Sequence, residues 1–153
     1  MKGKGWVAVI GPGAVGGVLA ASLSKAGFEV RLAARQGGEA GRLARAGLGF
    51  EGPDGRKRVV RGLKALGASP RPDGPCAAVF LAVKARDLAS ALPAARAAAG
   101  PDTPVVSLLN GVGHENSVRR AAGRRRAVIG SCYFAAMRSG PRAVRHAGGR
   151  LVW

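Results

Sequence analysis

A glycine-rich turn directly behind a short apolar run constrains this chain more than any other feature of its sequence. The turn follows the apolar segment Trp6–Ile10 and has the spacing G-x-G-x-x-G. In such a turn the first glycine permits a tight bend out of a strand, the second lets the backbone approach a pyrophosphate, and the third allows close helix packing. The unpaired amides at the start of the next helix suit an anion. The pattern predicts a dinucleotide site formed by Gly11, Pro12, Gly13, Ala14, Val15 and Gly16.

Strand-like and helix-like segments alternate along the chain. Short apolar runs typical of buried strands are separated by alanine-rich stretches typical of helices. We expect an α/β fold of the Rossmann type, with a doubly wound, mostly parallel sheet, helices on both faces and closing strands at the C-terminus, in one domain over residues 1–153. The expected strands are Trp6–Ile10, Phe28–Ala34, Ala77–Val83, Pro104–Leu109 and Ala127–Met137, and the expected helices are Val18–Ala26, Gly38–Ala46, Leu88–Ala99 and Glu115–Ala122.

Three further segments stand outside this alternation. Leu48–Phe50 and Arg58–Val60 flank a Gly-Pro-Asp-Gly sequence that favours a turn, so a hairpin is expected there. Ser69–Pro75 is a proline-rich connection, and Arg142–Trp153 has the alternation of a strand or hairpin.

The net charge of +17 raises the question of nucleic-acid binding, because phosphates attract arginine clusters such as Arg119-Arg120 and Arg124-Arg125-Arg126. The basic residues are nevertheless spread through the chain, among abundant alanine, glycine and proline, which indicates a coding bias. We therefore expect no nucleic-acid partner, and a basic nucleic-acid binder remains an alternative.

The sequence also bears on compartment and metal binding. No run approaches the roughly 18 apolar residues of a membrane span, and the N-terminus has no signal-peptide core, so we expect a cytoplasmic protein without a membrane partner. Cys76 and Cys132 are isolated and lack metal-ligand spacing. We expect buried thiols in a reducing compartment and no metal site.

The end of the second expected strand bears on the choice of dinucleotide. NAD-selective folds of this type carry an Asp or Glu there, which binds the ribose 2′-hydroxyl. This strand ends in Ala33-Ala34-Arg35, without an acid. Because a guanidinium can bind a 2′-phosphate with two parallel hydrogen bonds, Arg35 predicts NADP(H) as the cofactor. Arg42, on the following helix, is a weaker second candidate.

Two more polar residues follow expected strands at the same edge of the sheet, where ligands of such folds bind. Lys84 directly follows the third strand, and Asn110 directly follows the fourth. A lysine behind a strand is often a surface residue and Asn-Gly a common turn pair, but at this edge both would face the crevice. Other polar residues receive structural interpretations: His114 and His146 as loop or structural residues, and Glu115 as a first-turn helix acid.

Taken in order, these segments resemble the N-terminal domain of the ketopantoate reductase (2-dehydropantoate 2-reductase) family. The resemblance is carried by VAVIGPGAVGG, EVRLAARQ, FLAVKARD, SLLNGVGHEN and IGSCYFAAMRSGPRAVRHAGGRLVW. It implies an NADPH-dependent reductase that converts 2-dehydropantoate, a 2-keto acid, to pantoate in pantothenate (vitamin B5) biosynthesis. It also implies roles for single residues: Gly11 to Gly16 at the pyrophosphate, Arg35 at the 2′-phosphate, Lys84 and Asn110 at the nicotinamide and substrate, and Ala136 against the cofactor.

The resemblance ends where the family's second, mostly helical domain would begin. That domain supplies a general-acid lysine, so we expect no catalytic residue within these 153 residues and a truncated chain with little or no activity of its own. We expect a complementing C-terminal domain, or self-association through apolar residues at Leu151, Val152 and Trp153. A stand-alone NADPH-binding module and another Rossmann dehydrogenase, acting on 2-keto acids, 3-hydroxy acids or sugar phosphates, remain alternatives.

Overall fold

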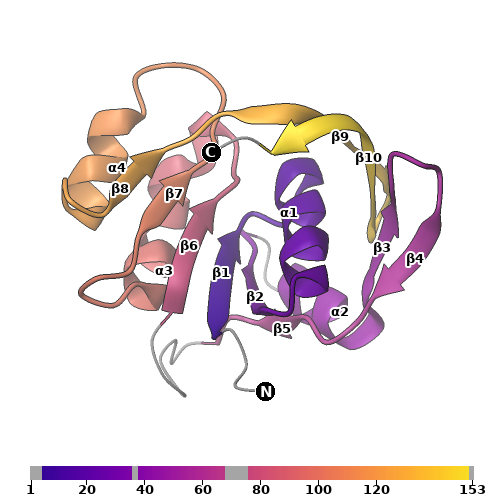
Figure 1. The fold of residues 1–153 in the computed structure, drawn as a ribbon. Helices are drawn as coiled ribbons and strands as arrows, with labels where there is room; N and C mark the ends of the chain where they lie inside the picture. The colour runs from indigo at the N-terminus through magenta and orange to yellow at the C-terminus, as the bar shows by residue number, and fades with distance from the viewer. Residues whose placement is uncertain (1–4, 36–37, 68–75, 152–153) are drawn as a thin grey trace.

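The larger of two sheets is entirely parallel and forms the centre of the molecule (Figure 1). The structure is a computed structural model, and it describes residues 5–35, 38–67 and 76–151. Six strands lie in the order β5-β2-β1-β6-β7-β8. Their bounds are β1 Trp6–Ile10, β2 Glu29–Ala33, β5 Lys64–Ala65, β6 Cys76–Leu81, β7 Val105–Ser107 and β8 Ala127–Ile129.

Helices cover both faces of this sheet because its central strand is apolar on both sides. Val7 and Val9 of β1 belong to the core on the side of α1 and α2. Ala8 and Ile10 face the opposite core, with α3 and α4. The helices are α1 Ala14–Lys25, α2 Glu39–Ala46, α3 Leu88–Ala98 and α4 Glu115–Ala122, with a short 3-10 turn η1 at Ala85–Asp87.

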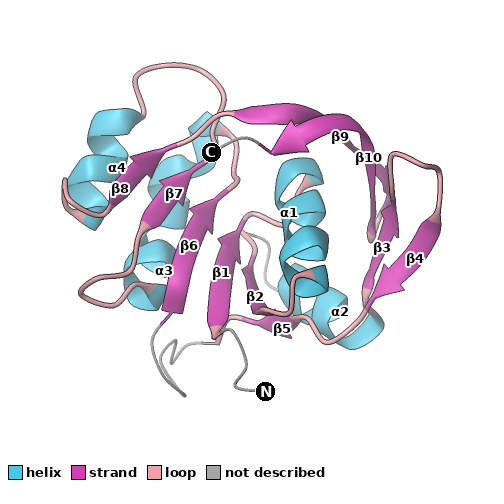
Figure 2. Ribbon diagram, in the orientation of Figure 1, coloured by secondary structure: helices cyan, strands magenta, loops and turns pink. Residues whose placement is uncertain are grey.

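A second sheet packs against the other side of α1, so this helix lies between two sheets (Figure 2). Its four strands lie in the order β4-β3-β10-β9. Gly17 of α1 permits this contact, because a Cβ there would lie 2.7 Å from Cγ1 of Val144. The bounds are β3 Leu48–Glu51, β4 Lys57–Val60, β9 Cys132–Gly140 and β10 Ala143–Leu151.

The expected α/β fold, with helices on both faces and closing strands at the C-terminus, is confirmed, as is the hairpin of β3 and β4. The expectation of one strand over Ala127–Met137 is wrong. The amide of Gly130 donates a hydrogen bond to the carbonyl of Ser107 at 2.8 Å, and the chain then leaves the large sheet. As a result β8 and β9 belong to different sheets.

The remaining differences are smaller. The first helix begins at Ala14, before the expected Val18, and β5 was not expected. Ser69–Pro75, Val152 and Trp153 lie outside the described residues, as does the side chain of Leu151.

Neither a membrane-spanning helix nor a metal cluster occurs in the described ranges. No helix there is long and apolar enough to cross a membrane, and no three His, Cys, Asp or Glu residues gather to hold an ion. Cys76 is buried, as expected, whereas Cys132 is only half-buried. Burial raises the pKa of both thiols.

Candidate functional site

The glycine turn between β1 and α1 is shaped by close backbone contacts at two of its glycines. Gly11 has a φ of +93° and donates its amide to the Ala33 carbonyl at 2.8 Å. A Cβ at Gly16 would lie 2.1 Å from the carbonyl oxygen of Gly11. A Cβ at Gly13 would meet no atom within 4 Å. The fold itself therefore requires Gly11 and Gly16, whereas the open space at Gly13 leaves room for a ligand.

A cleft of about 600 Å³ opens beside this turn, at the carboxyl ends of β1, β2 and β6. Parallel α/β sheets bind their ligands at this edge. The turn of the β9–β10 hairpin, the start of α2 and the first two turns of α3 complete the walls. The lining residues are Ile10, Gly11, Pro12, Gly13, Ala33, Ala34, Arg35, Glu39, Arg42, Ala82, Val83, Lys84, Arg86, Asp87, Ser90, Ala91, Ala94, Arg138, Pro141 and Arg142.

Positive charge dominates the cleft, since six basic and two acidic side chains line it. Each acid is paired: Asp87 Oδ1 lies 2.6 Å from Arg35 Nη1, and Glu39 pairs with Arg138. The other four basic residues form no salt bridge with any described residue, and they are Arg42, Lys84, Arg86 and Arg142. A site of this composition attracts an anion with several charges.

Half of the residues expected at the site line this cleft. They are Gly11, Pro12, Gly13, Arg35 and Lys84, and the weaker candidate Arg42 lines it too. Ala14, Val15 and Gly16 form the first turn of α1 directly behind the glycine turn. The first turn of this helix has no acidic residue, so its free amides remain suited to an anion.

Asn110 and Ala136 do not line the cleft. Asn110 is exposed in the loop that follows β7. Ala136 is half-buried and packs on the hydrophobic core, because alternate residues of β9 face inward. Arg138, two residues farther along β9, reaches the cleft. Cofactor roles for Asn110 and Ala136 therefore stay predictions.

Sequence reasoning missed Asp87, Arg138 and Arg142. A local signal existed for Asp87, since it follows Lys84 by three residues and so lies near the same strand end. Arg138 and Arg142 had none, because their position depends on the hairpin of β9 and β10 reaching the edge of the other sheet.

The residues given structural interpretations lie outside the cleft. Hydrogen bonds from the backbone amides of Glu115 itself and Gly113 lower the pKa of the Glu115 carboxyl, as expected of a helix first-turn acid. His114 is buried before α4, and neither ring nitrogen has a hydrogen-bond partner among the described residues. His146 packs edge-to-face on Phe134.

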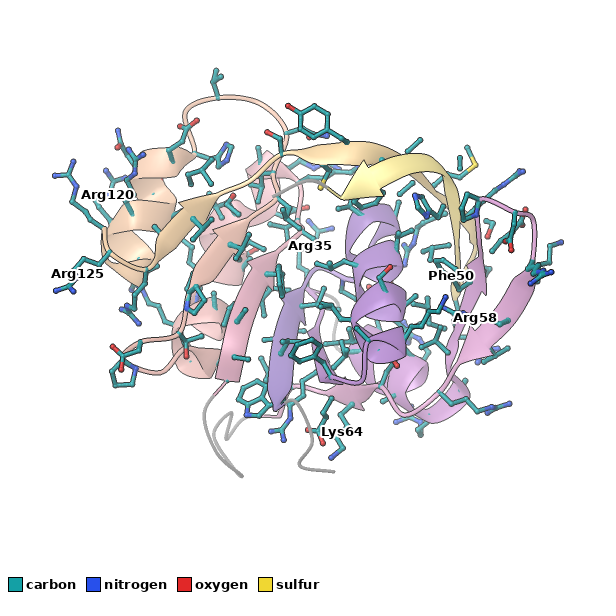
Figure 3. All side chains as sticks on the ribbon, in the orientation of Figure 1. Arg35, Phe50, Arg58, Lys64, Arg120 and Arg125 are labelled. Carbon is teal, nitrogen blue, oxygen red and sulfur yellow. The ribbon has the colours of Figure 1, made fainter. Side chains whose placement is uncertain are left out.

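The cleft fits a dinucleotide in three respects. The helix amides behind the turn and the space at Gly13 suit a pyrophosphate, and the unpaired basic side chains suit a further phosphate. Figure 3 shows Arg35 near the centre of the view, whereas Arg120 and Arg125 project from the region of α4 at its edge.

Solved structures similar to this chain include enzymes about twice its length. A ketopantoate reductase of Ralstonia eutropha JMP134 shares 30% identity, with a TM-score of 0.74 over 93% of this chain and 46% of its own. A D-mandelate dehydrogenase, solved with NADH and anilino(oxo)acetate, shares 26% identity, with a TM-score of 0.81 over 93% of this chain and 45% of its own. The 2-dehydropantoate 2-reductase of Methylococcus capsulatus shares 24% identity, with a TM-score of 0.79 over 95% of this chain and 46% of its own. At this identity the likeness is one of fold.

The chain thus spans a little under half the length of these structures. Comparison with curated proteins gives no match. A family model described as ketopantoate reductase PanE/ApbA matches residues 7–153. Together with the parallel sheet and the glycine turn at its centre, this match shows that the chain belongs to the ketopantoate reductase family.

Proposed function

We propose that this chain is the NADP(H)-binding half of a reductase that converts a 2-keto acid to a 2-hydroxy acid. The observation that carries the proposal is the basic cleft beside the glycine turn, with Arg35 at the carboxyl end of β2. Family membership supports the class of reaction, and 2-dehydropantoate is the proposed substrate, with pantoate for pantothenate biosynthesis as the product.

In this proposal the chain's own residues hold the cofactor by its phosphates. The amides at the start of α1 bind the pyrophosphate, and Arg35 with Arg42 binds the 2′-phosphate. The bound nicotinamide supplies the hydride. Lys84 and Asn110 are proposed to contact the nicotinamide end and the substrate carboxylate or carbonyl, and Ala136 the cofactor. The general acid is proposed to come from residues beyond these 153, so the chain alone should turn over slowly.

A second substrate class deserves the same test. The likeness to a D-mandelate dehydrogenase, at 26% identity, supports a 2-keto acid with an aromatic side chain as the second candidate substrate. Reductase assays of the chain, alone and with a complementing second half, would compare 2-dehydropantoate with phenylglyoxylate. Faster turnover of phenylglyoxylate would replace the proposed substrate while leaving the reaction class intact.

Calorimetric titration with NADPH and, in parallel, NADH tests the cofactor. We expect the chain to bind NADPH more tightly. Arg35→Ala should weaken NADPH binding by about tenfold, the lower end of the range for a hydrogen bond to a charged group, because the guanidinium is largely exposed. NADH binding should change little, since NADH lacks the 2′-phosphate.

Arg125→Ala is the matched control, since it removes the same charge beyond α4, away from the cleft. It should leave both affinities unchanged. Failure of the wild-type chain to bind either cofactor would overturn the proposed function. Equal losses for NADPH and NADH in Arg35→Ala would overturn the phosphate role of Arg35.

A further inference from the structure

A carboxylate from another part of the chain lies at the carboxyl end of β2, where the strand itself ends without an acid. An acid that ends the second strand usually binds the ribose 2′-hydroxyl of NAD in this fold, and β2 has none. Asp87 belongs instead to η1, which follows β6. Its Oδ1 nevertheless lies 2.6 Å from Nη1 of Arg35, so a carboxylate and a guanidinium share the end of β2.

This ion pair connects the two sides of the cleft. In the large sheet β2 and β6 are the two neighbours of β1, whose carboxyl end leads into the glycine turn. Arg35 follows β2, and Asp87 follows β6. A ligand that reaches Arg35 from the glycine turn therefore meets both partners of the pair, which line the same cleft.

Backbone hydrogen bonds fix the position of Asp87, and its side chain is the less exposed of the pair. Its amide donates to the Lys84 carbonyl at 2.8 Å, and its carbonyl accepts the Ser90 hydroxyl at 2.8 Å. The Asp87 side chain is 20% exposed, whereas that of Arg35 is 61% exposed. The carboxylate is thus a fixed feature of the cleft, and the guanidinium is the partner that can turn toward another anion.

We propose that Asp87 sets the preference of this chain between 2′-phosphorylated and 2′-hydroxyl dinucleotides. The inference rests on the proposed function, because it concerns the same cofactor site. A 2′-phosphate must share Arg35 with a carboxylate that repels it. A 2′-hydroxyl can donate a hydrogen bond to Asp87 and leaves the ion pair intact. Asp87 therefore reduces the ratio of NADPH affinity to NADH affinity that Arg35 creates. As a result, NADH also binds at this site.

The other charged groups of the cleft do not remove this competition. Glu39 is already paired with Arg138. Arg42 attracts a 2′-phosphate but is not paired with Asp87, and Lys84 attracts both dinucleotides through phosphates that the two share. Of the charged groups of the cleft, the proposed function places Arg35, Arg42 and Asp87 near the ribose 2′ position. Asp87 is the one among them that repels a phosphate. The expected effect is several-fold, the size typical of a partly exposed ion pair.

Asp87→Asn tests the inference, with dissociation constants for NADPH and NADH measured by calorimetry at one salt concentration. We expect NADPH to bind about fivefold tighter and NADH about threefold weaker, in line with charge effects at partly exposed sites. Asparagine also suits the residue before a helix, so α3 should persist, and Asp87→Ser serves if the first variant does not fold. Asp87→Glu keeps the charge and should keep the wild-type preference.

Asp54→Asn is the control, because Asp54 is the acid of an ion pair with Arg56 at 3.5 Å in the turn between β3 and β4. It should change neither affinity. If the wild-type chain binds NADPH but Asp87→Asn leaves the ratio of the two constants unchanged, the inference is wrong and the proposed function stands. Weaker NADPH binding in Asp87→Asn would also overturn it, since Asp87 would then only orient Arg35. If the wild-type chain binds neither NADPH nor NADH, both the proposed function and this inference are wrong.

Discussion

At the scale of single residues, the glycines of the turn have different roles: Gly16 is needed for folding, and Gly13 leaves space for the ligand. Gly13→Ala should leave the stability of the protein unchanged, because its φ of −73° suits alanine and a Cβ there meets nothing within 4 Å. The methyl group would fill the space assigned to the pyrophosphate. We expect dinucleotide affinity to fall about tenfold or more, the effect of overfilling a close contact. Thermal denaturation and calorimetry measure the two quantities on one sample.

Gly16→Ala is the contrasting variant. Its Cβ would lie 2.1 Å from the Gly11 carbonyl oxygen, a backbone atom that cannot move aside alone. The free energy of unfolding should fall by about 2 kcal/mol or more. If Gly13→Ala binds cofactor as the wild type does, the space beside Gly13 is not the pyrophosphate site.

Residues near their strand in the chain were predictable, and residues brought in from afar were not. Arg35 and Lys84 directly follow apolar runs, so their place at the sheet edge follows from the sequence. Asp87 had a local signal, but its pairing with Arg35, 52 residues away, had none. Arg138 enters the cleft from a strand of the other sheet. Such contacts depend on the crossing of strands, which a local pattern does not encode.

At the scale of elements, an ion pair joins the two-residue strand β5 to its neighbour β2. Glu29 of β2 accepts hydrogen bonds from Lys64 of β5 at 2.5 Å and from Arg31 at 2.7 Å. These bonds, with the one from Lys64 contributing most, lower the pKa of Glu29. The carboxylate therefore stabilises the fold fully above its unfolded pKa of about 4.3, and this contribution is lost as the pH falls through the lower folded value.

Glu29→Gln should lower the free energy of unfolding at pH 7 by about 1 kcal/mol, because it leaves the buried Arg31 without its carboxylate. The difference from wild type should shrink below about pH 4, where the wild-type carboxyl also becomes neutral. Urea denaturation at pH 7 and pH 3 measures it. A difference of the same size at both pH values would show that packing, and not charge, explains the effect.

Helix α1 has its own requirement, since it lies between two sheets. Gly17→Ala should destabilise the protein by about 1–3 kcal/mol, because the new Cβ would lie 2.7 Å from Val144. Gly41→Ala in α2 is the matched control, since its Cβ meets only the end of the flexible Arg45 side chain, at 3.3 Å. It should stabilise the protein by about 0.5–1 kcal/mol through helix propensity. A loss of similar size in both variants would contradict a role for sheet contact.

Most helices and strands could be predicted from apolar runs in the sequence. The assignment of the strands to two separate sheets could not. Ala127–Met137 has the composition of one long strand, but β8 ends near the hydrogen bond from Gly130 to Ser107, and β9 then begins in the other sheet. The same limit applies to β5, which is too short to leave a periodic pattern in the sequence.

At the scale of the whole molecule, the net charge and the exposed apolar side chains have opposite effects on self-association. The net charge of +17 keeps copies of the chain apart at low salt. Strand β9 is nevertheless an edge strand of the smaller sheet, and its outer face exposes Tyr133 and Met137, at 67% and 50%. Edge strands of this kind pair with other chains when nothing covers them.

Self-association should therefore increase with salt, because at 1 M ionic strength charges are screened beyond about 3 Å. Tyr133→Lys should reduce it, since a lysine on an edge strand opposes pairing with a second copy. Val112→Lys adds the same charge at a residue that is 95% exposed in a loop, and it should have little effect once charges are screened. Sedimentation velocity at low and high salt compares the three proteins. A wild-type chain that stays monomeric at high salt, or equal effects of the two lysines, would show that the β9 edge does not drive association.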